Sequence, residues 1–214
     1  MTQKDVIRKF EELGVVIINS HIVYTSGKHG SAYVNKDVIY SDTQLTKDFC
    51  LLIADNFNND GIEVVVGHAT GGAILAQYMA QHLTAITGRK IYAAYADKEE
   101  FSKEEKFIIR RGYNKLVYKK RVLIVEDVLN TGGSVKKVID AVRFINGNVI
   151  GVGALCNRGN VTSEQIGNPP KFFSLTNISL EAFKEEDCPL CAKKIPINTD
   201  IGKGREYLAR IGKN

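Results

Sequence analysis

The sequence lacks the features that would place it in a membrane or on nucleic acid. No run of eighteen apolar residues occurs, so we expect no membrane-spanning helix and no membrane partner. The N-terminal segment MTQKDVIRKFEEL lacks the apolar core of a signal peptide, which predicts a cytoplasmic protein. There is also no Lys/Arg-rich tail and no basic strand interleaved with aromatic residues. Although the net charge is +5, we therefore expect no nucleic-acid partner.

Cysteine is scarce, and its four positions limit the metal chemistry that the sequence suggests. Cys50 and Cys156 lie in apolar stretches and are predicted to be buried small hydrophobes. Cys188 and Cys191 form the single CxxC motif, and no histidine follows His82. Because structural zinc usually takes four protein ligands, we predict no metal-ligating residues in this chain alone. Two reduced thiols near a turn, a redox pair and a zinc site shared across a dimer remain alternatives for the CxxC pair.

The rest of the sequence alternates short β-prone apolar runs with longer helical ones. This order predicts an α/β fold in which a parallel β-sheet is flanked by helices. Parallel sheets bind ligands at the carboxyl ends of their strands, so the loops that follow the strands are the candidate site. We expect strands at 15–18, 63–67, 90–96, 120–128, 148–157 and 172–178, a hairpin over 21–40, and helices at 4–13, 43–59, 73–86, 134–145 and 199–211.

The string VLIVEDVLNTGGS, residues 122–134, is the strongest motif. Its four apolar residues predict a buried strand that delivers Glu126 and Asp127 together at its carboxyl end. Adjacent carboxylates are costly to bury without partners, but they can accept hydrogen bonds from the vicinal hydroxyls of a ribose. The loop from Asn130 to Ser134 then opens a helix, and its glycines let backbone N–H groups converge on a phosphate. The motif predicts a site for a phosphorylated sugar; a plain turn with a Ser N-cap is the alternative.

This string resembles the signature of the type I phosphoribosyltransferases, in which two acidic and two apolar residues precede a small-Thr-Gly-Gly-Ser/Thr loop. The resemblance implies a single domain over 1–214, with a small hood over the base formed by residues of about 1–40 and 160–214. It also implies 5-phosphoribosyl-1-pyrophosphate (PRPP) as substrate, Mg²⁺ as cofactor and a homodimer. The implied PRPP-binding residues are Thr70, Gly71, Gly72, Lys98, Glu126, Asp127, Val128, Leu129, Asn130, Thr131, Gly132, Gly133 and Ser134.

Further segments, across roughly residues 20–205, resemble the members of this family that use orotate. They are YTSGKHGSAYVN at 24–35, VVGHATGG at 65–72, AYADKEE at 94–100, FIIRRGY at 107–113, CNRG at 156–159 and the CPLC motif with IPI after it. The resemblance implies transfer of phosphoribosyl to orotate, giving orotidine 5′-monophosphate and pyrophosphate. It implies catalytic roles for Lys98 and Asp127, and contacts to orotate from Asn130 and Arg158.

Basic residues crowd into the polar segment 98–121, which is long enough for a lid that closes over bound substrate. Lys98, Lys103 and Lys106 could then bring positive charge to the departing pyrophosphate. A solvated, salt-bridged surface segment is the alternative. At the end of another expected strand, Arg158 can bind a planar carboxylate bidentately, although an isolated arginine there is more often a surface residue.

The chain departs from the orotate pattern at positions where many members carry a cation. Thr25 and Gly71 stand where a Lys is usual, Asp97 stands where an Arg is usual, and the loop has no His. Arg110 or Arg111 could compensate, or could be structural. These losses keep two alternatives open, a purine phosphoribosyltransferase and a regulator that binds PRPP without turnover. We expect His68 and Thr70 only to shape a turn, and His29 to be an ordinary loop residue.

Overall fold

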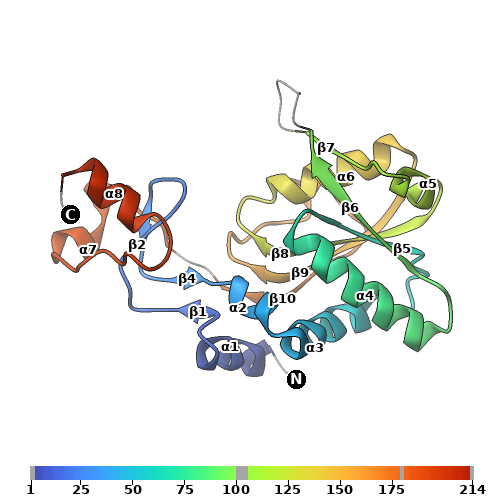
Figure 1. Ribbon diagram of the computed structural model, residues 1–214, viewed down its shortest axis with the longest axis horizontal. Helices are drawn as coiled ribbons and strands as arrows, with labels where there is room; N and C mark the ends of the chain where they lie inside the picture. Colours follow the sequence, from blue (N-terminus) through green and yellow to red (C-terminus); the bar gives the residue numbers. More distant parts are fainter. Residues whose placement is uncertain (1–2, 100–105, 179–180, 213–214) are drawn as a thin grey trace. The chain divides into compact units, whose positions relative to one another are not determined.

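The computed structural model describes residues 3–99, 106–178 and 181–212 of the 214-residue chain (Figure 1). Contacts within the chain divide it into two units. The sheet unit comprises Met1–Gln3 and Ile39–Ile178, and the terminal unit comprises Lys4–Val38 and Ser179–Asn214. Within the described residues, no helix is both long and apolar enough to cross a membrane.

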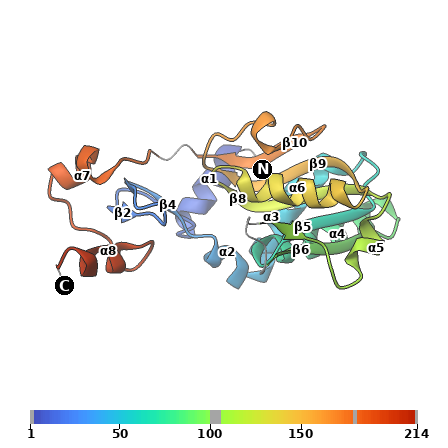
Figure 2. The same ribbon diagram turned by 90° about the horizontal axis from the view of Figure 1, so that it is seen from above.

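The sheet unit is built on six strands in the order β10-β9-β8-β5-β6-β7, most of which can be followed in Figure 2. All neighbours pair in parallel except the short β7, which runs antiparallel to β6. The predicted α/β fold with a parallel sheet is thus confirmed. The strands are β5 (Val64–His68), β6 (Tyr92–Lys98), β7 (Phe107–Ile108), β8 (Arg121–Leu129), β9 (Asn148–Asn157) and β10 (Phe172–Asn177).

Helices cover both faces of this sheet because successive strand residues point to opposite sides. On one face, α6 (Gly133–Phe144) buries valines and an isoleucine at three- and four-residue spacings against alternate residues of β5, β8 and β9. On the other face lie α3 (Thr43–Ala54) and α4 (Gly71–Thr87). There Gly153 of β9 lies against Ile53 of α3.

The chain reverses its direction of travel across the sheet between β5 and β8. From β5 the connection through α4 leads to β6 on one side, whereas from β8 the connection through α6 leads to β9 on the other. Open parallel sheets bind ligands at such a switch point, outside the carboxyl ends of the two strands. The residues that end β5 and β8 therefore mark the candidate site.

The terminal unit contains only short elements and joins the two ends of the sequence. Strand β1 pairs antiparallel with β4, and β2 pairs antiparallel with β3. The hairpin predicted over 21–40 is therefore confirmed for its first half, where β2 pairs with β3. In its second half β4 pairs with β1 instead of with the hairpin. The elements are α1 (Gln3–Glu12), β1 (Val16–Ile17), β2 (Ile22–Val23), β3 (His29–Gly30), β4 (Tyr33–Val34), α7 (Pro189–Ala192), α8 (Gly204–Arg210) and a 3-10 turn at Glu185–Asp187.

Two expectations about segment boundaries require correction. The segment 98–121 contains regular structure that the sequence did not suggest, because β7 pairs with the end of β6 and α5 (Tyr113–Val117) follows it. Residues 160–178 belong to the sheet unit rather than to a C-terminal hood, because β10 pairs with β9 along its length. The remaining elements are α2 (Asp37–Ser41) and the 3-10 turns Asp55–Phe57 and Glu164–Ile166.

Candidate active site

Two buried carboxylates occupy the carboxyl-terminal part of β8, as the sequence predicted. Glu126 and Asp127 are 2% and 3% exposed, and every one of their four oxygens accepts a hydrogen bond. His68, at the end of β5, donates to Glu126 Oε2 (2.8 Å), and the Asp127 N–H donates to Glu126 Oε1 (2.9 Å). The Tyr40 hydroxyl donates to Asp127 Oδ2 (2.7 Å), and the Val128 N–H donates to Oδ1 (2.6 Å). These donors hold the acidic pair in place at the switch point.

His68 supplies the positive charge that accompanies the acidic pair. Its hydrogen bond to Glu126 raises the pKa of His68 to about 9, and its Nδ1 donates to the Ala69 carbonyl (2.8 Å). Burial raises the pKa of Glu126, and it also raises the pKa of the Tyr40 phenol, so that Tyr40 remains a donor. Near neutral pH the imidazolium thus offsets one negative charge of the pair, which leaves the site less repulsive to an anionic substrate.

The loop after β8 presents backbone N–H groups at the start of α6. Gly132 has a left-handed φ of 75°, a conformation that glycine adopts without steric cost, and α6 begins at the next residue. Asn130, Thr131 and Ser134 are exposed, so their polar groups are accessible. The first N–H groups of a helix have no partners within the helix, and the helix dipole favours an anion there. The loop has the structure expected of a phosphate site.

A third strand end approaches this loop closely. At the end of β9, the N–H groups of Arg158 and Gly159 both donate to the Leu129 carbonyl, at 2.9 Å and 3.0 Å. A Cβ at position 159 would lie 1.6 Å from the Asn130 carbonyl oxygen, so only glycine permits this approach. The half-buried Arg158 is thereby held beside the loop that opens α6.

The turn between β5 and α4 completes the arrangement on the other side of β8. Gly71 and Gly72 form the first turn of α4 and are buried. A Cβ at position 71 would lie 2.3 Å from both Asp127 Oδ2 and the Tyr40 hydroxyl oxygen. Position 71 therefore has no room for a side chain while Tyr40 and Asp127 remain hydrogen-bonded.

Comparison with known proteins agrees with this geometry. The model of the phosphoribosyl transferase domain matches residues 40–186. The orotate phosphoribosyltransferase of Thermoanaerobacter sp. (strain X514) is 36% identical over 197 residues, which cover 92% of this chain and 96% of that protein. The chain belongs to the type I phosphoribosyltransferase family.

Solved structures show the same fold for this phosphoribosyltransferase. The orotate phosphoribosyltransferase of Aeropyrum pernix superposes with a TM-score of 0.63 at 21% identity, over 80% of this chain and 93% of that one. The adenine phosphoribosyltransferase of Thermoanaerobacter pseudethanolicus superposes with a TM-score of 0.59 at 15% identity, over 79% of this chain and 99% of that one. Both kinds of enzyme share the architecture, so the fold alone does not select the base.

The phosphoribosyltransferase brings most, but not all, of the predicted site residues together. The acidic pair, the loop 130–134, the glycines of α4 and Arg158 surround the carboxyl ends of β5, β8 and β9. Lys98 ends β6 and is exposed, and β5 lies between its strand and β8. Thr70 is exposed at the residue before α4. Lys103 lies outside the described residues.

The structure also gives physical reasons for two of the departures in sequence. Many orotate enzymes have a lysine where this chain has Gly71. Here a side chain at position 71 would overlap the hydrogen-bonded Tyr40 hydroxyl and Asp127 carboxylate. Asp97, which stands where an arginine is usual, lies 3.4 Å from the guanidinium of Arg111. Arg111, which follows β7, thus places its guanidinium beside the side chain at position 97.

Sequence reasoning missed three residues of the site. Tyr40 lies in no recognisable motif, and Asp127, to which its hydroxyl donates a hydrogen bond, is 87 positions away in the chain. His68 was expected only to shape a turn, although its position at the end of a predicted strand was a usable signal. Asn157 bonds through its side chain to both the N–H and the carbonyl of Val161, each at 2.9 Å, and so shapes the loop that carries Arg158.

The CxxC pair has neighbours in the structure that lie far from it in the sequence. No histidine follows His82 in the sequence, but the structure brings two histidines from the N-terminal part of the chain to Cys188 and Cys191. One of them is His29, which is fully buried rather than an ordinary loop residue. The cluster belongs to the terminal unit, whereas the PRPP motif belongs to the sheet unit.

Proposed function

We propose that this phosphoribosyltransferase transfers phosphoribosyl from PRPP to orotate, giving orotidine 5′-monophosphate and pyrophosphate. The observation that carries the proposal is the position of Arg158, whose backbone is hydrogen-bonded to Leu129 beside the phosphate loop. A guanidinium there can bind the planar carboxylate of orotate with two parallel hydrogen bonds. A purine offers no carboxylate for it. The names of the curated relatives support the same choice of base.

In this proposal β8 and its loop bind the phosphoribosyl group. Glu126 and Asp127 accept hydrogen bonds from the ribose hydroxyls, because a carboxylate oxygen that already accepts one bond still has a second lone pair. The N–H groups and hydroxyls from Asn130 to Ser134 bind the 5′-phosphate at the start of α6. Val128 and Leu129 place this loop relative to the acidic pair, and Asn130 also contacts orotate.

The departing pyrophosphate would be stabilised from the β5 and β6 ends. As the bond from C1 to pyrophosphate stretches, the ribose becomes oxocarbenium-like and the pyrophosphate gains negative charge. Donors aimed at that charge bind the transition state more tightly than the ground state. The backbone of Thr70, Gly71 and Gly72 provides such donors, and Lys98 adds a positive charge from the β6–β7 hairpin.

Mg²⁺ is the proposed cofactor, and the residues at this site fit an ion that arrives with PRPP. Glu126 and Asp127 are only two carboxylates, and each of their oxygens already accepts one hydrogen bond, so they offer too few ligands for a dedicated metal cage. Mg²⁺ commonly retains several waters and binds through substrate phosphates and one or two carboxylates. Bound in that way, it would neutralise the pyrophosphate. The homodimer, the cytoplasmic location and the hood over the base stay predictions.

Steady-state assays with purified protein, PRPP and Mg²⁺ test the proposal directly. We expect pyrophosphate release with orotate and none with adenine, guanine, hypoxanthine or xanthine. Turnover of a purine but not of orotate would assign the protein to the salvage enzymes. Tight PRPP binding without turnover of any base would instead indicate a PRPP-binding regulator.

A further inference from the structure

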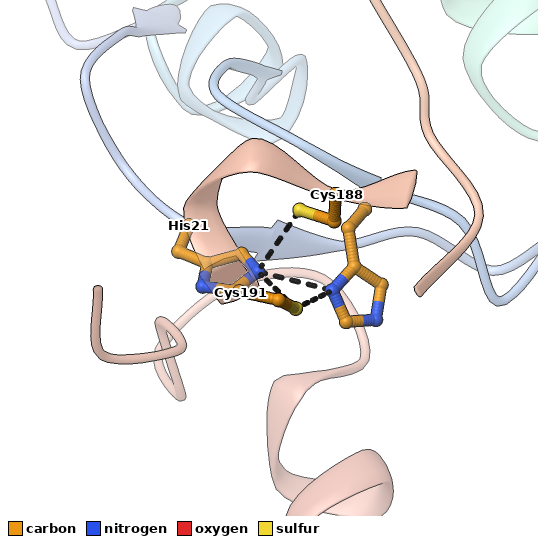
Figure 3. A group of neighbouring side chains, drawn as sticks. His21, Cys188 and Cys191 are labelled. Carbon is orange, nitrogen blue, oxygen red and sulfur yellow. Dashed lines mark hydrogen bonds between the residues drawn. The ribbon is translucent and has the colours of Figure 1, made fainter. Parts of the chain in front are cut away.

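The terminal unit contains a cluster of two histidines and two cysteines that the proposed transfer reaction does not use. His21 directly precedes β2, and His29 is the first residue of β3. Cys188 directly precedes α7 and Cys191 lies within it (Figure 3 labels His21, Cys188 and Cys191). One nitrogen or sulfur atom from each residue lies within 4.8 Å of all the others. Among residues 3–99, 106–178 and 181–212, this is the one group of three or more His, Cys, Asp or Glu side chains whose ligand atoms lie close enough together to hold a metal ion.

The distances within the cluster match those of a tetrahedral ligand set. His21 Nε2 lies 3.0 Å from His29 Nδ1, 3.7 Å from Cys188 Sγ and 3.6 Å from Cys191 Sγ; His29 Nδ1 lies 3.3 Å from Cys191 Sγ. Tetrahedral zinc, with bonds of about 2.0 Å to nitrogen and about 2.3 Å to sulfur, separates two nitrogens by about 3.3 Å and nitrogen from sulfur by about 3.5 Å. The four atoms thus already surround a space of the size of one zinc ion.

The surroundings fix the orientation of both imidazole rings. His21 Nδ1 lies 2.7 Å from the Ile195 carbonyl, which can only accept, so Nδ1 carries the hydrogen and the lone pair of Nε2 faces the cluster. Metal-binding histidines generally donate their other N–H in this way. The His29 ring packs edge-on against Tyr207, with ring centroids 5.0 Å apart, and its Nε2 is buried without a hydrogen-bond partner among the described atoms.

Backbone hydrogen bonds bring the ligands together from opposite ends of the sequence. The His29 N–H donates to the Phe183 carbonyl and the Phe183 N–H donates to the His29 carbonyl, both at 2.8 Å. The Asn198 N–H donates to the His21 carbonyl at 2.7 Å. Each histidine is therefore anchored directly to the C-terminal segment that carries Cys188 and Cys191.

The size of the terminal unit explains why it would need a metal. It comprises about 70 residues in two separate pieces, and its strands are two residues long. A core this small rarely stabilises a fold alone, and natural small domains add disulfides or a structural metal. The cysteines are free thiols rather than a disulfide.

We propose that His21, His29, Cys188 and Cys191 bind one structural Zn²⁺ that holds the N-terminal hairpin to the C-terminal segment. Two sulfurs and two imidazoles in tetrahedral spacing favour zinc over the oxygen-preferring Mg²⁺. With His21 and Cys188 2% exposed and His29 fully buried, four protein ligands fill the coordination sphere and leave no position for a substrate.

Metal analysis of the full-length protein, purified without a metal-binding tag, tests this proposal. We expect about one zinc per chain. The variants His21→Gln and Cys191→Ser should lose it, whereas the matched controls His82→Gln and Cys50→Ala should retain it. The controls change a histidine and a cysteine of the sheet unit, outside the cluster. Zinc that persists in Cys191→Ser, or iron in place of zinc in the unmodified protein, would overturn the assignment.

Cobalt substitution tests the site even if the variants do not fold. The unmodified protein is stripped with a chelator and titrated with Co²⁺. We expect the strong visible absorption of tetrahedral cobalt together with a thiolate charge-transfer band, both displaced by Zn²⁺. The weak spectrum of octahedral cobalt would contradict the proposal, and so would a Cys188–Cys191 disulfide in metal-free protein as purified. Neither measurement depends on which base the enzyme uses.

Discussion

Gly159→Ala tests the closest approach in the site, between the end of β9 and the phosphate loop. The added Cβ would lie 1.6 Å from the Asn130 carbonyl oxygen and 2.6 Å from its carbon. Both neighbours are backbone atoms, so no side-chain rotation can relieve the overlap. Reaching even a 3.0 Å contact requires the two segments to separate by about 1.4 Å.

That separation has a cost in stability and a larger cost in activity. The two hydrogen bonds to the Leu129 carbonyl would lengthen beyond bonding distance, which should lower the free energy of unfolding by about 2 kcal/mol. Arg158 would move away from the phosphate loop with the rest of its segment. Because a displacement of about 1 Å in a positioning group can cost about 10²-fold in rate, we expect kcat/KM to fall by at least that factor.

Gly88→Ala provides the matched control. Gly88 has a left-handed φ of 66° after α4, and a Cβ there would have no neighbour within 4 Å. Its replacement should cost about 1–2 kcal/mol in stability through backbone strain alone, with kcat/KM unchanged. Both variants are compared by denaturant unfolding and by steady-state kinetics. Unchanged kcat/KM and unchanged stability in Gly159→Ala would refute the loop contact.

Three further substitutions separate the roles of the charged residues. The raised pKa of His68 contributes stability that is fully present below about pH 6.5 and is lost as the pH rises through about 9. The stability difference between the unmodified protein and His68→Gln, followed by urea unfolding across pH, should therefore shrink from about 2–3 kcal/mol to near zero over that range; a constant difference would contradict the ion pair. Lys98→Ala should lower kcat by about 10²-fold while the unfolding free energy of this exposed site changes by less than about 0.5 kcal/mol; normal turnover would remove Lys98 from the mechanism. Arg158→Ala should raise the KM for orotate by about 10- to 100-fold with PRPP affinity, measured by calorimetry, little changed; an equal loss for PRPP would place Arg158 on the phosphate instead.

Local sequence patterns predicted the sheet unit well because its chemistry is contiguous. The buried strand, the acidic pair and the phosphate loop all lie within residues 122–134, and the structure keeps them in that order. Strong apolar runs also identified the other strands of the parallel sheet. The short β7 was missed because two residues carry no periodicity, so its segment was taken for part of a lid.

Contacts between distant parts of the chain could not be predicted in the same way. Tyr40 reaches Asp127 across 87 positions, and no local pattern marks the pair. The two histidines of the zinc cluster precede the cysteines by about 160 positions or more, which is unlike the compact spacing of ordinary zinc motifs. Contacts between the β2–β3 hairpin and the C-terminal segment, among them the backbone bonds of His29 with Phe183, bring these residues together.

The discontinuity of the terminal unit dictates an order of events during synthesis. The sheet unit is nearly continuous, from Ile39 to Ile178, so it can fold while the ribosome is still adding the residues that follow it. The hairpin with His21 and His29 emerges before the sheet unit, yet it must wait for the segment from Ser179 onward. Chains released early, before Cys188, would therefore expose an incomplete N-terminal piece to proteases. The segment from Ser179 onward, made after the sheet unit, thus completes the hairpin that was made before it.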